Sequence, residues 1–210
     1  FDGKDDVVET KPHLNPTNAI TVSVWAKSNT PQWNQYGCLA SKREAYVLHP
    51  MAGSKEIIFY IFSGGWKPVA YTPSNIDLTK WHHYAGTFDG KNLRLYIDGG
   101  EVATQPCVGT INPDSGALSI GQDDGLAGRF FGGQIAEVRI WNRALSKEEI
   151  PREMNARLVG NEVGLVGYWP LNEGANNTIN DKTSNGNHGT IQGASWQLEK
   201  ALPLVVPKTN

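Results

Sequence analysis

The chain has 210 residues, of which 39% are hydrophobic and 10% aromatic, and it contains 23 glycines and 12 prolines. These proportions allow a substantial core and predict a turn-rich chain that forms one domain over residues 1–210. The net charge of −2 argues against nucleic acid or an anionic membrane surface as a partner. No apolar stretch approaches the roughly 18 residues that a membrane span needs.

Short alternating segments fill the first third of the chain. Residues 20–28 (ITVSVWAKS) alternate cleanly, which predicts a half-buried strand. Residues 36–50 and 55–64 predict two more strands, one on each side of the breaker MAGS, and residues 67–74 predict another. Segments of this length and spacing favour an all-β chain.

A double hairpin is expected over residues 81–103. Asp89-Gly90 supplies the positive φ that a two-residue turn needs, and Asp98-Gly99-Gly100 makes a second turn. Three short strands joined this tightly predict an antiparallel sheet.

The second half adds two strands and one helix. Residues 116–122 predict a short strand, and residues 134–141 (QIAEVRIW) a longer one with Ala136, Val138 and Ile140 on one face. Ser146 and Glu149 form a capping-box pattern, and apolar residues keep helical spacing as far as Leu158, with a glycine stop at residue 160.

Four segments share a pattern with a known family: FDGKDDVVE at 1–9, WHHYAGTFDGKNLRLYIDG at 81–99, GGQIAEVRIWNRALSKEEI at 132–150, and a block beginning GYWPLNEG at 167–196. They resemble the LamG-like jelly-roll domains of the concanavalin A-like lectin/glucanase superfamily. The resemblance implies an antiparallel two-sheet jelly-roll sandwich with one short helix. In that family the GYWPLNEG block usually precedes the FDG strand, whereas here it follows. The domain is therefore expected to be permuted or excised, with residues 165–198 closing the same sandwich.

Catalysis is not expected. The enzymes of this superfamily are glycoside hydrolases with two carboxylates on one strand, and retaining chemistry places such a pair about 5 Å apart. The corresponding E-x-D-x-x-E and E-x-D-x-E patterns are missing from the sequence. The five histidines have no zinc-type spacing, and no nucleophile elbow or phosphate-binding loop is present.

Aromatic residues outside the strand patterns are candidates for ligand binding. Trp33 and Tyr36 lie in the polar stretch SNTPQWNQYG, and Trp66 follows two glycines. An exposed ring can cover the C–H face of a sugar while neighbouring amides bind its hydroxyl groups. The alternative is that these rings close the open ends of the sandwich.

The resemblance also implies calcium as a cofactor. Related jelly rolls, including pentraxins, often place a ligand-contacting calcium ion at a rim loop that resembles Gly121-Gln122-Asp123-Asp124-Gly125. We therefore add Gln122 and Asp123 to the ligand-binding candidates, and Asp123 and Asp124 to the metal ligands. Asp181 to Asn187 would supply a second, structural site, but Ala136 stands where the family usually has an aspartate.

These observations predict a lectin-like module that binds a glycan or polysaccharide and belongs to a larger extracellular or cell-surface protein. The alternative is a laminin G-type adhesion or scaffold module with an extracellular protein as its partner. A lectin needs a local concave site, whereas an adhesion module needs a flatter interface of at least about 1,000 Å². Cys38 and Cys107 could form a disulfide or could be two small buried residues.

Overall fold

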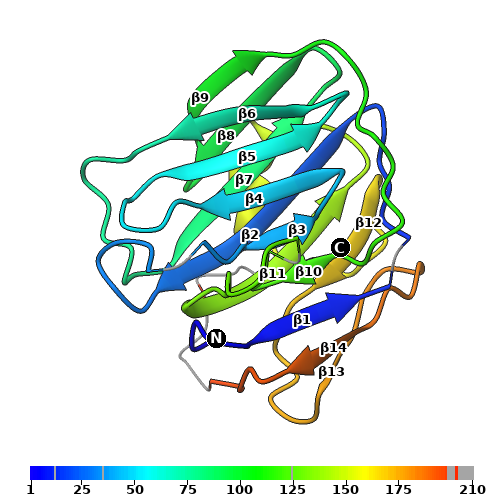
Figure 1. Cartoon of the computed structure of the whole chain (residues 1–210). Coiled ribbons are helices and arrows are strands. Elements are labelled where there is room, and N and C mark those ends of the chain that lie inside the picture. The colour runs from blue at the N-terminus through cyan, green and yellow to red at the C-terminus, as the bar shows by residue number, and fades with distance from the viewer. Residues whose placement is uncertain (12, 35, 124, 198–201, 203–210) are drawn as a thin grey trace.

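The structure is a computed structural model that describes residues 1–11, 13–34, 36–123, 125–197 and 202. Two antiparallel sheets pack face to face (Figure 1). The eight-stranded sheet has the order β13 (Thr178–Ile179), β14 (Gly189–Gln192), β1 (Val7–Thr10), β10 (Ser119–Ile120), β3 (Ala40–Lys42), β4 (Tyr46–Pro50), β5 (Ile57–Phe62) and β6 (Trp66–Tyr71). The six-stranded sheet has the order β12 (Leu165–Trp169), β11 (Gly133–Trp141), β2 (Ile20–Ser28), β7 (His82–Phe88), β8 (Asn92–Ile97) and β9 (Gly100–Pro106). The predicted jelly-roll sandwich with one short helix is confirmed.

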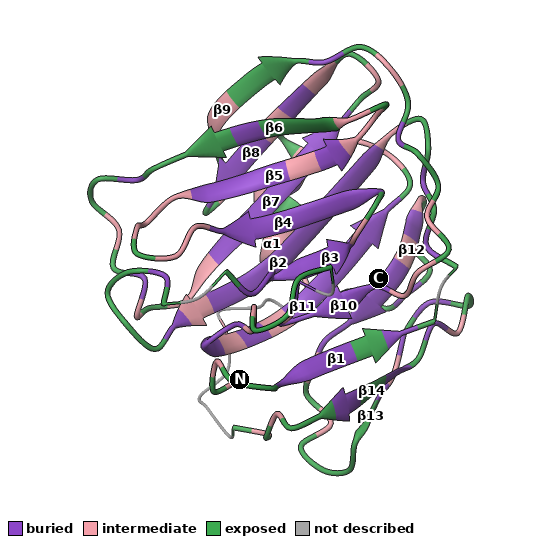
Figure 2. Cartoon of the chain, viewed as in Figure 1, coloured by how far each residue is buried: buried purple, intermediate pink, exposed green. Residues whose placement is uncertain are grey.

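The main core lies between the two sheets. Alternate residues of β2 and β8 from one sheet and of β4 and β5 from the other form one continuous apolar cluster. Gly86 on β7 leaves the space that the ring of Phe59 occupies, and a Cβ atom at that position would clash with the ring. Figure 2 shows buried residues along the central strands and exposed residues along the edge strands β6 and β9. The sandwich is therefore filled by its two inner faces.

Two strand predictions need correction. Residues 36–50 were expected to form one strand but fold as β3 and β4, an antiparallel pair joined by a turn at Arg43–Ala45. On β11, a bulge between Ala136 and Arg139 interrupts the expected alternation, and Glu137 adopts a φ of 54°. The core residue before the bulge is consequently Ile135 rather than Ala136.

Both turns of the double hairpin are present. Asp98 and Gly99, with φ values of 50° and 82°, make the two-residue turn between Ile97 and Gly100. The first turn lies one residue later than expected, because the Asp89 amide donates to the Asn92 carbonyl at 3.3 Å across Gly90 and Lys91. The Asp89 carboxylate stabilises this turn by accepting the amides of both Lys91 and Asn92.

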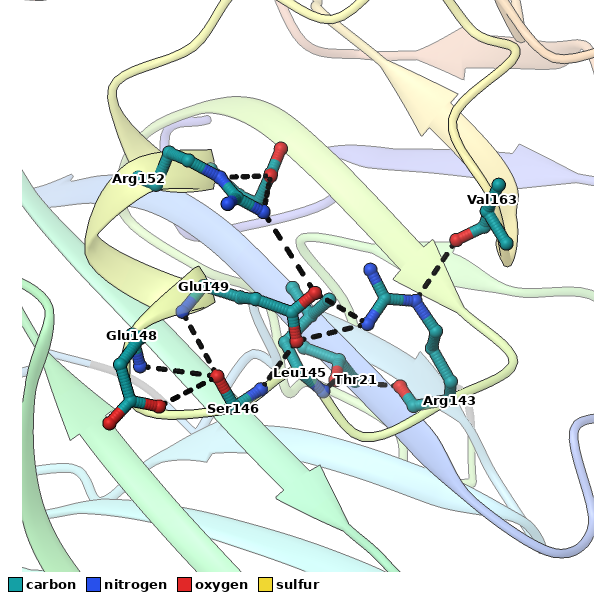
Figure 3. A network of polar contacts seen from close by, with 9 residues as sticks. Thr21, Arg143, Leu145, Ser146, Glu148, Glu149, Arg152 and Val163 are labelled. Carbon is teal, nitrogen blue, oxygen red and sulfur yellow. Dashed lines mark hydrogen bonds and ion pairs between the residues drawn. The ribbon is translucent and has the colours of Figure 1, made fainter.

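The helix α1 (Glu149–Met154) begins at the predicted capping box (Figure 3). The Glu149 amide donates to the Ser146 hydroxyl at 3.2 Å, and the Ser146 amide donates to the Glu149 carboxylate at 2.8 Å. Just before it, the buried Thr21 hydroxyl accepts the Leu145 amide and donates to the Arg143 carbonyl, both at 2.8 Å. These contacts fix the start of α1 to β2.

The expected continuation of the helix to Leu158 is wrong. Side chains of the six-stranded sheet bind carbonyl groups at and just beyond the helix end: Trp25 Nε1 donates to the Met154 carbonyl at 3.0 Å, and Arg139 donates to those of Glu153 and Ala156. Helical spacing in the sequence could not reveal these tertiary acceptors.

The C-terminal block contributes to both sheets. β12 pairs with β11, β14 pairs with β1, and β13 pairs with β14. The permuted or excised origin of the domain stays a prediction. Cys38 and Cys107 are both buried and form no disulfide.

Candidate functional site

A cavity of about 230 Å³ lies on the face of the eight-stranded sheet that points away from the core. Its lining consists of Arg43, Val47, His49, Tyr60, Trp66, Asp123 and Arg129. Val47 and Tyr60 are directly paired on neighbouring strands, and His49 lies two residues beyond Val47 on the same face. The strands β4 and β5 thus supply a rigid floor.

Loops supply the charged groups. Arg43 comes from the turn between β3 and β4, and Asp123 and Arg129 come from the segment between β10 and β11. That segment is held by pairing of Gln122 with Phe130 and by the Asp123 amide, which donates to the Arg129 carbonyl at 3.0 Å. Gly125 lies against the Arg43 guanidinium, where a Cβ atom would clash.

Asp123 is the centre of the charge arrangement. The residue is fully buried, and each of its carboxylate oxygens accepts a hydrogen bond from a different arginine. Arg43 Nη1 lies 2.5 Å from Oδ1, and Arg129 Nη1 lies 3.1 Å from Oδ2. The arginine side chains keep 31% and 35% exposure, so their outer atoms reach solvent.

Two exposed rings flank the two arginines. The Arg43 guanidinium lies 5.4 Å from the centre of the Trp66 ring, and that of Arg129 lies 4.9 Å from the Tyr36 ring. Tyr36 is 38% exposed and Trp66 37%. Tyr60 packs edge-on against Trp66 at 5.8 Å. Cation–π stacking of this kind restricts the guanidinium planes and the rings together.

His49 adds a neutral polar group at the floor. Burial, assisted by the nearby Arg129 and Arg43, lowers the pKa of His49, and Asp123 opposes this only partly. Among the described residues, no group forms a hydrogen bond with its buried Nδ1 atom. Side-chain atoms of Cys38, His49 and Asp123 lie within 4.8 Å of one another. Asp123 is committed to both arginines, however, so this trio does not fit a cation.

The structure brings together three of the sequence-predicted ligand residues: Trp66 and Asp123 line the cavity, and Tyr36 lies beside it against Arg129. The prediction for Trp33 is wrong, because its ring is 1% exposed and packs in the core, 5.7 Å from Tyr84 and 6.0 Å from Phe131. Trp33 instead packs inside the sandwich, which agrees with the alternative of a structural ring. Gln122 does not line the cavity, and Asp124 lies outside the described residues.

The metal binding predicted for Asp181 and Asn187 stays a prediction, and the Asp181 carboxylate already organises its loop. The Asp181 carboxylate accepts five hydrogen bonds: from the amides of Tyr168, Thr183 and Asn187, from the Thr183 hydroxyl and from the Asn187 side-chain amide. The distances run from 2.9 to 3.1 Å. To bind calcium, this carboxylate would have to give up some of its donors, whereas the buried Asn187 Oδ1 atom has no hydrogen-bond partner among the described residues.

Sequence reasoning missed Arg43, Arg129, His49 and Tyr60. The available signal was the polar run at residues 42–44 between two apolar segments, which is typical of a hairpin turn and would have placed Arg43 at a strand end. No local pattern indicates that the Arg129 side chain binds the Asp123 carboxylate, because that contact depends on how the loop between β10 and β11 folds.

A second cavity, of about 350 Å³, opens where β11 and the C-terminal block meet, and Trp81, Glu137 and Trp196 are among its lining residues. Two of its polar groups, those of Glu137 and Trp196, already have partners. The Glu137 carboxylate binds Arg139 at 2.6 Å and the Tyr168 hydroxyl at 2.8 Å, and Trp196 Nε1 donates to the Asn176 carbonyl. The smaller cavity brings two guanidinium groups together on one buried carboxylate, next to the exposed Trp66 ring, and is therefore the better candidate for a site.

Comparison with known families identifies the chain. Residues 2–151 match the laminin G family model Laminin_G_3, described as the concanavalin A-like lectin/glucanases superfamily. The chain belongs to this superfamily. Residues beyond the match supply β12, β13 and β14 of this laminin G-type domain.

Two curated relatives are pentraxins or related proteins. The domain is 26% identical over 144 residues to C-reactive protein 3.3 of Limulus polyphemus, covering 62% of the chain and 59% of that protein. It is 26% identical over 174 residues to the pentraxin-related protein PTX3 of Mus musculus, covering 74% and 43%. The chain thus spans about three fifths and two fifths of the lengths of these relatives.

Solved structures share the fold. A putative carbohydrate-binding protein from Bacteroides ovatus superposes with a TM-score of 0.73 at 18% identity, covering 90% of this chain and 56% of that one. Domain 4 of the extracellular arabinanase AbnA from Geobacillus stearothermophilus, solved with arabinotriose, gives a TM-score of 0.58 at 19% identity, covering 72% and 73%. Both establish the fold alone.

Proposed function

We propose that this laminin G-type domain binds carbohydrate, without catalysis, in the cavity above β4 and β5. The observation that carries the proposal is the combination of two exposed rings, Trp66 in the lining and Tyr36 beside it against Arg129, with a convergent set of hydrogen-bonding groups. This is the combination that sugar recognition requires, with apolar faces for the ring and polar groups for its substituents. The carbohydrate-binding neighbours among the solved structures support it.

A binding role is favoured over hydrolysis by the number of carboxylates. Among the described residues, Asp123 is the one carboxylate that lines the cavity, and it is tied to two arginines. Glycoside hydrolysis uses two carboxyl groups, one as the acid and one as the nucleophile or base. The cavity therefore has no pair for this chemistry in the described part of the chain.

We also propose that the domain acts as a module of a larger extracellular or cell-surface protein. Its pentraxin relatives are longer than this chain, and laminin LG domains share its fold. No helix in the described residues is long and apolar enough to cross a membrane.

Replacing Trp66 by alanine should weaken glycan binding at least tenfold, about 1.4 kcal/mol, because the exposed ring would supply a large share of the contact area. The matched control is Tyr71→Ala, at the far end of the same edge strand, where another ring is 37% exposed outside the cavity. Binding is first located on a broad glycan array and then measured by calorimetry. If Trp66→Ala and Tyr71→Ala weaken binding equally, or if neither changes it, the glycan binds outside this cavity.

Glycan binding at this cavity should survive removal of calcium. Both oxygens of Asp123 are held by guanidinium groups, so the site is assembled without a cation. Affinity measured with calcium and with a chelator should agree within about twofold, a difference of only ~0.4 kcal/mol. Calcium-dependent binding would instead require Asp123 to exchange its arginines for an ion.

A further inference from the structure

The candidate site carries unbalanced charge. Of the described residues that line it, Arg43 and Arg129 are positive, Asp123 is negative, and His49 is held neutral by burial. Two guanidinium groups share one carboxylate, so one positive charge is left over. This surplus sits beside a fully buried carboxylate, on a floor of buried side chains, where electrostatic interactions are stronger than in open water.

The geometry leaves donors for a ligand. Among the described residues, each guanidinium forms one hydrogen bond, through Nη1, to its own oxygen of Asp123. A guanidinium has five N–H groups in a fixed fork, which matches the oxygens of a carboxylate or sulfate. Asp123 therefore acts as a positioning residue: it holds the inner nitrogen of each arginine and leaves outer N–H groups toward the solvent-accessible side.

The two arginines are also held laterally. Trp66 lies beside Arg43 and Tyr36 beside Arg129, so that each cation has a carboxylate at its inner end and an aromatic face along its plane. A ligand that places its sugar ring between Tyr36 and Trp66 would bring its substituents to both guanidinium groups. An acidic substituent would meet the surplus charge there.

We infer that the glycan recognised by this domain is acidic, carrying a carboxylate or sulfate group that Arg43 and Arg129 bind together while Trp66 and Tyr36 contact the sugar ring. This inference rests on the proposed function and specifies its ligand class. A neutral sugar would satisfy the aromatic surfaces but would leave the surplus positive charge uncompensated.

The test compares ligands that differ only in charge. Oligogalacturonides are measured against their methyl esters, and sulfated glycosaminoglycan fragments against desulfated ones, by calorimetry with the unmodified protein. The acidic member of at least one pair should bind tenfold or more tightly than its neutral partner, because charge-assisted hydrogen bonds are about twice as strong as neutral ones. Its affinity should also fall between low salt and about 0.5 M salt. The pair that responds distinguishes a carboxylate from a sulfate.

Variants locate the effect. Arg43→Gln and Arg129→Gln should each lower the affinity for the acidic ligand at least tenfold and reduce its advantage over the neutral partner. Arg43→Lys should recover part of the affinity, since it keeps the charge and loses the fork. The control is Arg94→Gln, which removes the same charge on the other sheet, from an arginine paired with Asp89 at 2.6 Å, and should leave binding unchanged. Thermal unfolding verifies that each variant is folded.

The outcomes separate this inference from the proposed function. Equal binding of acidic and neutral partners, both weakened by Trp66→Ala, would overturn the acidic ligand and leave carbohydrate binding intact. If inorganic sulfate competes as well as the sulfated sugar does, and Trp66→Ala has no effect, the site is a simple anion site. That outcome would overturn both the acidic glycan ligand and the proposed carbohydrate binding. Failure of every glycan to bind would overturn the proposed function itself.

Discussion

Replacing Arg139 by methionine should lower the free energy of unfolding by about 3–5 kcal/mol, because it breaks a buried ion pair. Arg139 is 1% exposed, and its Nη2 atom lies 2.6 Å from the Glu137 carboxylate, which is itself 3% exposed. The same guanidinium donates to the carbonyl groups of Glu153 and Ala156. Without it, the Tyr168 hydroxyl at 2.8 Å would be the remaining hydrogen-bond partner of the Glu137 carboxylate among the described residues.

The measurement is urea unfolding followed by tryptophan fluorescence. A matched control is Arg152→Met on α1, whose side chain is 67% exposed and pairs with Glu153 at 3.0 Å, and which should cost less than about 1 kcal/mol. The double replacement Glu137→Gln with Arg139→Met should recover part of the loss, since it removes the uncompensated charge. A loss for Arg139→Met as small as that of Arg152→Met would contradict a buried structural pair.

Replacing Asp181 by alanine should cost roughly 3 kcal/mol or more, because several buried donors lose their acceptor at once and each is expensive to leave unpaired. The amides of Tyr168, Thr183 and Asn187 all converge on this carboxylate. They connect the loop at residues 181–187, between β13 and β14, to β12, so the replacement should loosen this loop from the six-stranded sheet.

Asp181→Asn provides the control, because it keeps one oxygen acceptor in the same shape and should cost less than the alanine replacement. Thermal unfolding is measured for each protein with calcium and with a chelator. The wild-type midpoint should not respond to calcium, since five donors already occupy the carboxylate. A calcium-dependent midpoint that disappears in both variants would return Asp181 to the role of a metal ligand.

Local patterns predicted the elements whose cause is local. The alternation of residues 20–28 became β2, Asp98-Gly99 became a two-residue turn with positive φ at both positions, and Ser146 with Glu149 became a capping box. In each case the decisive interactions lie within a few residues, so that periodicity and turn chemistry contain the information. The helix was overextended because its end depends on Trp25 and Arg139, residues of strands distant in the sequence.

The sequence by itself determined the sandwich class and the family. It also led us to expect that aromatic rings in loops would line a ligand site together with the rim residue Asp123. Only the tertiary structure decided which rings are available: Trp33 turned into the core, whereas Tyr36 and Trp66 stayed exposed. It also decided that Asp123 pairs with Arg43, which lies 80 positions away in the sequence. Together with Arg129, this pairing leaves both carboxylate oxygens of Asp123 bound by guanidinium groups. The physical reason is that exposure and ion pairing are set by the packing of distant strands and loops, and no local pattern of residues records it.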